Sequence, residues 1–328
     1  MTDSIRQPLL TQKGRLTDPC WAVDDIFEYN KENIRLPFRR REWEFYQVFN
    51  EHFAFQVFYD HGPGGGRVGA TLVDFDTEER VTCGKRQLFC GDSLDLDFSF
   101  SEPHTLKFED KELFLSIGFD GRMRQLIVRS DRFDVELCGL CDTEAMAAAI
   151  PFARKSCFLY QYRMIFPHFS GHVHMHKLDY PLGEGTVMAL SSGRGVLPYQ
   201  STRIWAAGGI QTGDGYLALN LGEDYGPESA PTENAVFLDC VMDKLGRVNF
   251  KFKSENLMRI WRISDTDRRV HLEFTPEFDN YEKAFTLVSD IRRHQLYGRL
   301  NGSVRLADRR VIKIENARFF IEHCGERR

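Results

Sequence analysis

Short segments in which apolar and polar residues alternate recur along most of this chain. Phe133 to Leu137 (FDVEL) and Leu113 to Phe119 (LFLSIGF) are two of them. A period of two is typical of antiparallel strands that have one buried and one solvated face. Turn dipeptides such as Asp120-Gly121, Asp214-Gly215 and Asn301-Gly302 separate the segments. The pattern predicts a meander of strands that forms barrels or sandwiches.

Helical patterns are scarce and fall in two places. Asp142 to Ala153 is Ala-rich and starts with a capping-type Asp, so we expect a short helix that Pro151 ends. Phe278 to Arg292 is a weaker helix candidate. Because the first segment lies near the middle of the chain, we interpret it as a connector. The sequence therefore predicts an all-β protein of two antiparallel barrel or sandwich halves, residues 1–150 and 151–328, joined by a short helical connector.

The composition is that of a globular protein, with 328 residues of which 42% are hydrophobic and 28% charged. The net charge of −5 argues against nucleic acid or an anionic membrane surface as the principal partner. No segment approaches the roughly 18 apolar residues of a membrane span. The chain has 27 Phe, 11 Tyr and 4 Trp, which favours strands and an aromatic-lined interior. We expect the partner to be a small molecule; the sequence does not indicate an oligomeric state.

The cysteines and the N-terminal segment bear on the compartment. The first 18 residues hold no apolar run long enough for a secretory signal. We therefore expect the 8 cysteines to be reduced and the protein to be cytoplasmic. Cys138 and Cys141 form a C-x-x-C pair, but no second pair completes a four-cysteine zinc site. We interpret them as packing thiols.

Two further features could suggest a metal or a cofactor. His172, His174 and His176 project to one face of a strand, but the outer pair are roughly 13 Å apart at 3.3 Å per residue, and no other ligand lies nearby in the sequence. The glycine-rich segment Gly62 to Gly69 lacks the Lys-Ser/Thr ending of a phosphate loop. We expect no bound metal and no cofactor.

The densest group of functional residue types lies between Gly193 and Asp239. Alternation places Arg203 and Trp205 on one strand face, and Glu233 and Asp239 on one face of another strand. Polar groups that face an aromatic cavity from adjacent strands are the usual form of a small-molecule site. The alternative is that Arg203 pairs with Glu233 or Asp239 in a buried network that fixes strand register.

The motifs of this region also carry a resemblance. In order they are Gly193-Arg194-Gly195, Asn220-Leu221-Gly222, Thr232-Glu233-Asn234-Ala235, Lys244-Leu245-Gly246, His294-Gln295 and Glu322-His323, preceded by Arg41-Glu42-Trp43. Their order resembles the bacterial domain-of-unknown-function family 2804 over nearly the whole chain. That family in turn resembles the lipocalin-like calycin superfamily of carotenoid hydratases, tocopherol cyclases and Diels–Alderases. Before Gly193 the resemblance leads us to expect an Asp-aromatic pair, whereas this chain has Ser191-Ser192.

The resemblance implies two lipocalin-like halves and cofactor-free lyase, hydratase or isomerase chemistry on a bulky, largely apolar substrate. Such chemistry needs a carboxyl group with a raised pKa and aromatic faces that stabilise positive charge. The candidate catalytic residues are Glu233, Asp239 and Arg203. The candidate ligand-binding residues are Tyr199, Trp205, Asn220, Glu223 and His323.

Two other classes of function stay open. A non-catalytic carrier of a hydrophobic ligand would have a cavity lined almost wholly by apolar groups. A carbohydrate-active enzyme would have two carboxyl groups about 5–9.5 Å apart across an open groove.

Overall fold

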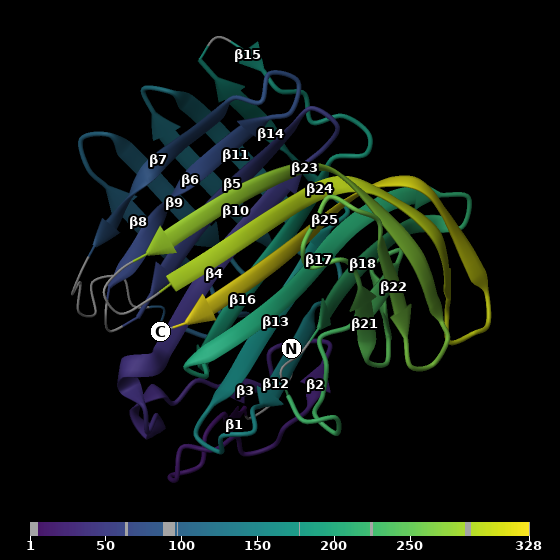
Figure 1. The fold of residues 1–328 in the computed structure, drawn as a ribbon. Helices are drawn as coiled ribbons and strands as arrows, with labels where there is room; N and C mark the ends of the chain where they lie inside the picture. The colour runs from purple at the N-terminus through teal and green to yellow at the C-terminus, as the bar shows by residue number, and fades with distance from the viewer. Residues whose placement is uncertain are drawn as a thin grey trace.

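Strands dominate the protein (Figure 1). The structure is a computed structural model that describes residues 6–62, 65–87, 96, 98–176, 178–223, 226–285 and 290–327. In these ranges the helical segments are two three-residue 3₁₀ turns, η1 (Lys31–Asn33) and η2 (Pro37–Arg39). The all-β prediction is confirmed. No helical segment of these ranges has the length and hydrophobicity to cross a membrane.

The described strands form three large sheets and one parallel pair, β1 (Gln7–Pro8) with β3 (Phe27–Glu28). The first large sheet is, in spatial order, β2 (Trp21–Ala22), β12 (Met146–Pro151), β13 (Phe158–Phe166), β16 (Val187–Val196), β4 (Arg40–Phe49), β5 (Phe53–His61), β6 (Gly66–Asp74) and β7 (Arg80–Gln87). The second is β15 (Leu178–Asp179), β14 (Phe169–Met175), β11 (Phe133–Leu140), β10 (Met123–Ser130), β9 (Leu113–Phe119) and β8 (His104–Glu109).

The third sheet belongs wholly to the C-terminal part of the chain and curls into a half-barrel. In spatial order it is β20 (Val241–Lys244), β19 (Ala235–Leu238), β18 (Gly215–Glu223), β17 (Gln200–Thr212), β25 (Val311–Arg327), β24 (Asp290–Arg305), β23 (Val270–Phe285), β22 (Trp261–Asp265) and β21 (Val248–Lys251). Figure 1 shows β17, β25, β24 and β23 running across the first sheet.

Both faces of the first sheet are buried, and strand β4 shows why. Its side chains alternate: Tyr46 and Val48 belong to the core shared with the second sheet, whereas Phe45 and Phe49 face the third sheet. The side chains of β17 in the third sheet alternate in the same way, between the core of that sheet and the face toward the first sheet. The first sheet is therefore a central layer, with the half-barrel packed against one of its faces.

Aromatic side chains hold the first and third sheets together. Phe45 from β4 meets Trp205 from β17 at 6.1 Å between ring centroids, in an edge-to-face arrangement. Phe320 from β25 lies 5.4 Å from Trp205 and 5.3 Å from Tyr297 of β24. Such pairs contribute about 0.5–1.5 kcal/mol each beyond the area that they bury. Aromatic packing thus joins the first and third sheets.

The expected helical connector is wrong. Met146 to Pro151 is strand β12, which pairs with β13. Both faces of this strand are buried, so its sequence is a continuous apolar run without alternation. The small side chains Ala147 to Ala149 suit a strand held between two packed layers. Packing on both sides outweighs the helical propensity of alanine here.

The second helix candidate is also wrong for its described residues. Phe278 to Phe285 continues β23, and Asp290 to Arg292 begins β24; residues 286–289 lie outside the described part. A register shift between Pro276 and Phe278 interrupts the alternation there, which removes the sequence signal for a strand.

The sheet membership changes between Val196, where β16 ends, and Gln200, where β17 begins. Residue 150, at which the sequence analysis divides the halves, lies inside β12 of the first sheet.

Candidate functional site

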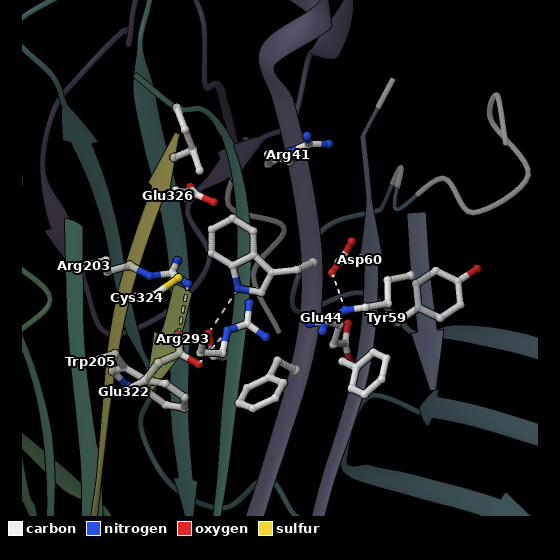
Figure 2. A pocket seen from close by; sticks show the side chains of 16 residues that line it. Arg41, Glu44, Tyr59, Asp60, Arg203, Trp205, Arg293, Glu322, Cys324 and Glu326 are labelled. Atoms are coloured by element: carbon white, nitrogen blue, oxygen red, sulfur yellow. Dashed lines mark hydrogen bonds and ion pairs between the residues drawn. The ribbon is translucent and has the colours of Figure 1, made fainter. Parts of the chain in front are cut away.

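A cleft of about 70 Å³ lies between the first and third sheets. Strands β4, β5, β6, β16, β17, β24 and β25 contribute to its walls (Figure 2). The lining combines arginines, carboxylates and aromatic rings. It comprises Arg41, Trp43, Glu44, Phe45, Phe58, Tyr59, Asp60, Arg67, Ser191, Leu197, Arg203, Trp205, Arg293, Glu322, Cys324 and Glu326.

One wall is formed by Trp43 of β4. Its partner across the ladder is Gly193 of β16, and a Cβ added to that glycine would lie 2.2 Å from the indole ring. The glycine therefore leaves the space that the indole occupies. The indole Nε1 donates a hydrogen bond to Ser191 Oγ at 3.1 Å. The guanidinium of Arg203 lies 5.2 Å from the ring centroid, within range of a cation–π interaction.

Glu322 is a buried carboxylate of the cleft and is held from three sides. Arg203 donates to its Oε1 at 3.3 Å, Arg293 Nε lies 3.4 Å from its Oε2, and the Gln295 amide donates to Oε2 at 3.2 Å. Burial alone would raise the pKa of Glu322, but the two arginines outweigh it, so the pKa lies below its ordinary value. Figure 2 shows this carboxylate beside both guanidinium groups. Glu322 is thus a fixed anion.

Glu326 lies four residues farther along the same strand and faces the same cleft. It is half-buried and accepts a hydrogen bond from Ser201 Oγ at 3.4 Å. Burial raises the pKa of Glu326 above its ordinary value, although Arg203, Arg41 and Arg293 lower it in part. Two carboxylates of one site whose pKa values are displaced in opposite directions are the pattern expected of an acid and a fixed charge. Glu326 is the cleft residue suited to donate a proton.

Two other lining residues do not fit a chemical role. Burial raises the pKa of the Cys324 thiol to about 11, so the thiol stays protonated at neutral pH and is a weak nucleophile. Glu44 borders the cleft, but its carboxylate is bound by Arg124 at 3.0 Å inside the core of the first two sheets.

The structure corrects the expected partner of Glu233. Its carboxylate binds Arg163 of β13, with Nε and Oε2 2.6 Å apart, and not Arg203, whose carboxylate partner is Glu322. Both members of the Arg163–Glu233 pair are buried, and neither lines the cleft. A Cβ on Gly222 would lie 2.3 Å from Glu233 Oε1, so the carboxylate packs directly on that glycine. Glu233 belongs to a buried ion pair behind the cleft.

Trp205 does line the cleft, and Asn220 fixes it from behind. The indole Nε1 donates to Asn220 Oδ1 at 2.9 Å, and the Asn220 amide donates to the main-chain oxygen of Glu233 at 2.7 Å. Arg163 lies 4.5 Å from the centroid of the Trp205 ring. Asn220 and the Arg163–Glu233 pair therefore orient the aromatic wall and do not reach the cleft themselves.

Four predicted site residues lie away from the cleft. Asp239 is exposed in the two-residue turn between β19 and β20, where its carboxylate accepts a hydrogen bond from the main-chain N–H of Tyr216 at 2.9 Å. Strand β19 ends before Asp239, so the expected alternation does not extend to this residue. Tyr199 is 54% exposed. Glu223 is exposed at the end of β18. His323 faces the opposite side of β25 from Glu322, where Phe252 and Trp261 pack around it.

Glu322, Glu326, Arg293 and Arg41 line the cleft but were not predicted as site residues from the sequence. The sequence held a signal for two of them: Glu322 and Glu326 are an even number of residues apart on one strand, so their side chains lie on the same face. Strands β4 and β24 face each other across the cleft because the two sheets pack together. No local sequence pattern predicts that packing.

In the described ranges one group of side chains could hold a metal ion: Asp142, His168 and Cys240, whose ligand atoms lie within 4.8 Å of one another. Asp142 and His168 are exposed and pair with each other at 2.9 Å. The histidine strand is not part of this group. The His172 and His174 rings are 4.7 Å apart, and His174 pairs with Asp179.

Comparison with solved structures supports the architecture. The crystal structure of CghA shares 9% identity with the chain, covering 98% of this chain and 96% of that one, with a TM-score of 0.51. The structure of CghA with Sch210972 shares 10% identity at the same coverage, with a TM-score of 0.52. Kievitone hydratase from Nectria haematococca shares 10% identity, covering 98% and 97%, with a TM-score of 0.48. At these identities the likeness to CghA shows a common fold.

No curated protein matches the chain. The family described as "Domain of unknown function (DUF2804)" matches residues 2–327, which confirms the resemblance inferred from the order of the motifs. The chain belongs to this family.

Proposed function

We propose that the protein is a cofactor-independent enzyme that transfers protons to and from a small molecule bound in the cleft, in a hydration, elimination or isomerisation reaction. Glu326 is the general acid. The observation that carries the proposal is the pair of carboxylates on one face of β25, with the pKa of Glu322 lowered and that of Glu326 raised. A fixed anion and a carboxyl group with a raised pKa on one face of a strand suit acid catalysis.

The aromatic walls have a role in this chemistry. Trp43 and Trp205 present their rings to the cleft, and an aromatic face stabilises the positive charge that develops when an unsaturated substrate is protonated. Arg203 is fixed between Trp43 and Glu322, so its guanidinium can orient a substrate oxygen.

In a hydration, Glu326 gives its proton to one carbon of a double bond. Water adds to the other carbon, and the proton that the water loses returns to Glu326. Elimination is the reverse, and an isomerisation moves one proton off and another on. The enzyme is unchanged in each case.

Two other classes of function have less support. A carrier of a hydrophobic ligand needs an apolar cavity, whereas this cleft is lined by four arginines and by the carboxylates of Asp60, Glu322 and Glu326. A glycosidase needs carboxyl groups that flank the scissile bond. Glu322 and Glu326 lie on the same strand and hence on the same wall. The fold shared with CghA, one of whose structures was determined with Sch210972, is compatible with ligand binding in this architecture.

The test is a comparison of metabolite mixtures before and after incubation with the protein. A deproteinised metabolite extract is treated with the wild-type protein in H₂¹⁸O and analysed by mass spectrometry. We expect a compound that gains or loses one water, or that changes retention at constant mass. Glu326→Gln should abolish the change, because the amide cannot donate a carboxyl proton.

Glu315→Gln is the matched control, since Glu315 lies on the same strand and is exposed. It should retain full turnover. Undiminished turnover by Glu326→Gln, or an extract that wild-type protein leaves unchanged, contradicts the proposal.

A further inference from the structure

The cleft has more positive groups than its own carboxylates neutralise through contacts. Arg67 binds Asp60 at 3.2 Å and Glu282 at 3.0 Å. Arg293 binds Glu322 at 3.4 Å and lies 3.6 Å from Glu282. Each of these two arginines is therefore held by two carboxylates.

Arg41 differs from them. Among the described residues we find no hydrogen bond or ion pair to its guanidinium, and its Nε is buried without a partner. It lies on β4 one alternation before Trp43, so both face the cleft. A Cβ on Gly62 would lie 1.8 Å from Arg41 Nη1, so the guanidinium packs closely against that main chain.

The electrostatic setting of Arg41 agrees with this geometry. Burial lowers the pKa of Arg41, and Asp60 and Glu326 compensate for only part of this effect. An arginine nevertheless stays charged in proteins. A partly desolvated cation of this kind is stabilised most by an anion that brings two oxygens to its planar donors.

The size of the cleft limits what can enter it. A cavity that takes benzene measures about 150 Å³, whereas this one measures about 70 Å³. The enclosed space therefore fits a small polar head group, and the body of a larger molecule must lie in the open part of the cleft. This qualifies the expectation of a bulky substrate enclosed between the halves.

We propose that the substrate of the cleft is a carboxylic acid whose carboxylate binds Arg41, while its reacting carbons lie against Trp43 within reach of Glu326. The inference rests on the proposed function and specifies its substrate class. A monoanion matches the one arginine of the lining that lacks a partner in the described part of the chain. The carboxylate end would fix the orientation in which the rest of the molecule meets the acid.

Two probes that differ only in charge test the inference: 4-phenylbutanoate and 4-phenylbutan-1-ol, titrated by calorimetry. We expect the acid to bind at least about tenfold more tightly than the alcohol. Arg41→Gln should reduce binding of the acid to the level of the alcohol, and Arg41→Lys should restore part of the difference. Arg129→Gln is the control, because Arg129 is a 58% exposed arginine on the second sheet.

Equal binding of acid and alcohol, or a preference for the acid that survives Arg41→Gln in a folded protein, overturns the inference. So does a failure of the acid to bind up to about 10 mM. Thermal unfolding checks that each variant folds. The proposed function fails separately, through turnover that does not need Glu326. If turnover needs Glu326 but the converted compound is uncharged, only the present inference fails.

Discussion

Two clusters of arginine and glutamate in this protein share their residue types but differ in their surroundings. In the core between the first and second sheets, Glu44 accepts from Arg124 at 3.0 Å and from Tyr46 at 2.7 Å, and His104 lies 3.4 Å away. In the cleft, Glu326 has a hydrogen bond from Ser201 at 3.4 Å and faces an opening. Glu44 is buried, whereas Glu326 is half-buried.

Their pKa values are displaced in opposite directions. Burial pushes the pKa of Glu44 up, but His104, Arg124 and Tyr46 outweigh it and lower the pKa to about 2. Burial prevails at Glu326 and raises its pKa. A completed set of partners thus produces a permanent, structural anion. Burial beside a cleft that nearby cations do not outweigh leaves a carboxyl group that can exchange a proton.

The largest expected effect is on the closed cluster. Arg124→Met leaves Glu44 buried without its cation, and breaking a buried pair in this way costs about 3–5 kcal/mol of the free energy of unfolding. Urea unfolding measures the loss. Arg129→Met, at an exposed arginine of the same strand, should change stability by less than about 0.5 kcal/mol. Equal small effects of both variants would remove the distinction between the two clusters.

The free energy of unfolding at acidic pH should also depend on Glu44. Its pKa in the folded protein is about 2, below the ordinary value of 4.5. A lowered pKa stabilises the fold fully above the ordinary value, and this contribution disappears as pH falls from about 4.5 to about 2. The shift corresponds to about 3 kcal/mol. Unfolding of wild type and Glu44→Gln across this range should show a stability difference that shrinks with falling pH; a constant difference contradicts the assignment.

Glu233→Gln tests whether the buried Arg163–Glu233 pair behind the cleft is structural or catalytic. The amide leaves the buried Arg163 without a counter-charge, so we expect a loss of about 1–3 kcal/mol in the free energy of unfolding. Because neither residue lines the cleft, turnover per folded molecule should stay near that of wild type. Unchanged stability with lost turnover would return Glu233 to the catalytic role that the sequence suggested.

Glu326→Gln should have the smallest effect on stability. Burial disfavours the charged form of Glu326, so an uncharged isostere should leave the free energy of unfolding within about 0.5 kcal/mol of wild type. Chemical denaturation gives the value. A loss comparable to that of Arg124→Met would mean that Glu326 is another structural anion.

The sequence was sufficient for the fold class because alternation is a local property of a strand. It correctly predicts β9, which spans Leu113–Phe119, and most of the other segments. It fails at β12, where packing on both faces removes the alternation, and at β23, where a register shift disturbs it.

The site was less predictable because it joins strands from two sheets. Alternation correctly placed Arg203 and Trp205 on one face, and both line the cleft. It could not show that Arg163, far away in the sequence, takes Glu233, or that Glu322 takes Arg203. The first pairing joins β13 of the first sheet to the third sheet, and the second depends on β25 lying beside β17; only the tertiary structure provides both.

The separation of the two cleft carboxylates can be measured directly. Carbon-13 NMR titration of glutamate-labelled protein gives both pKa values, with the Glu326 and Glu322 signals assigned from their absence in Glu326→Gln and Glu322→Gln. The pKa of Glu326 should lie above the ordinary 4.5 and that of Glu322 below it. A Glu326 that titrates at or below 4.5 would contradict its role as the acid of the cleft.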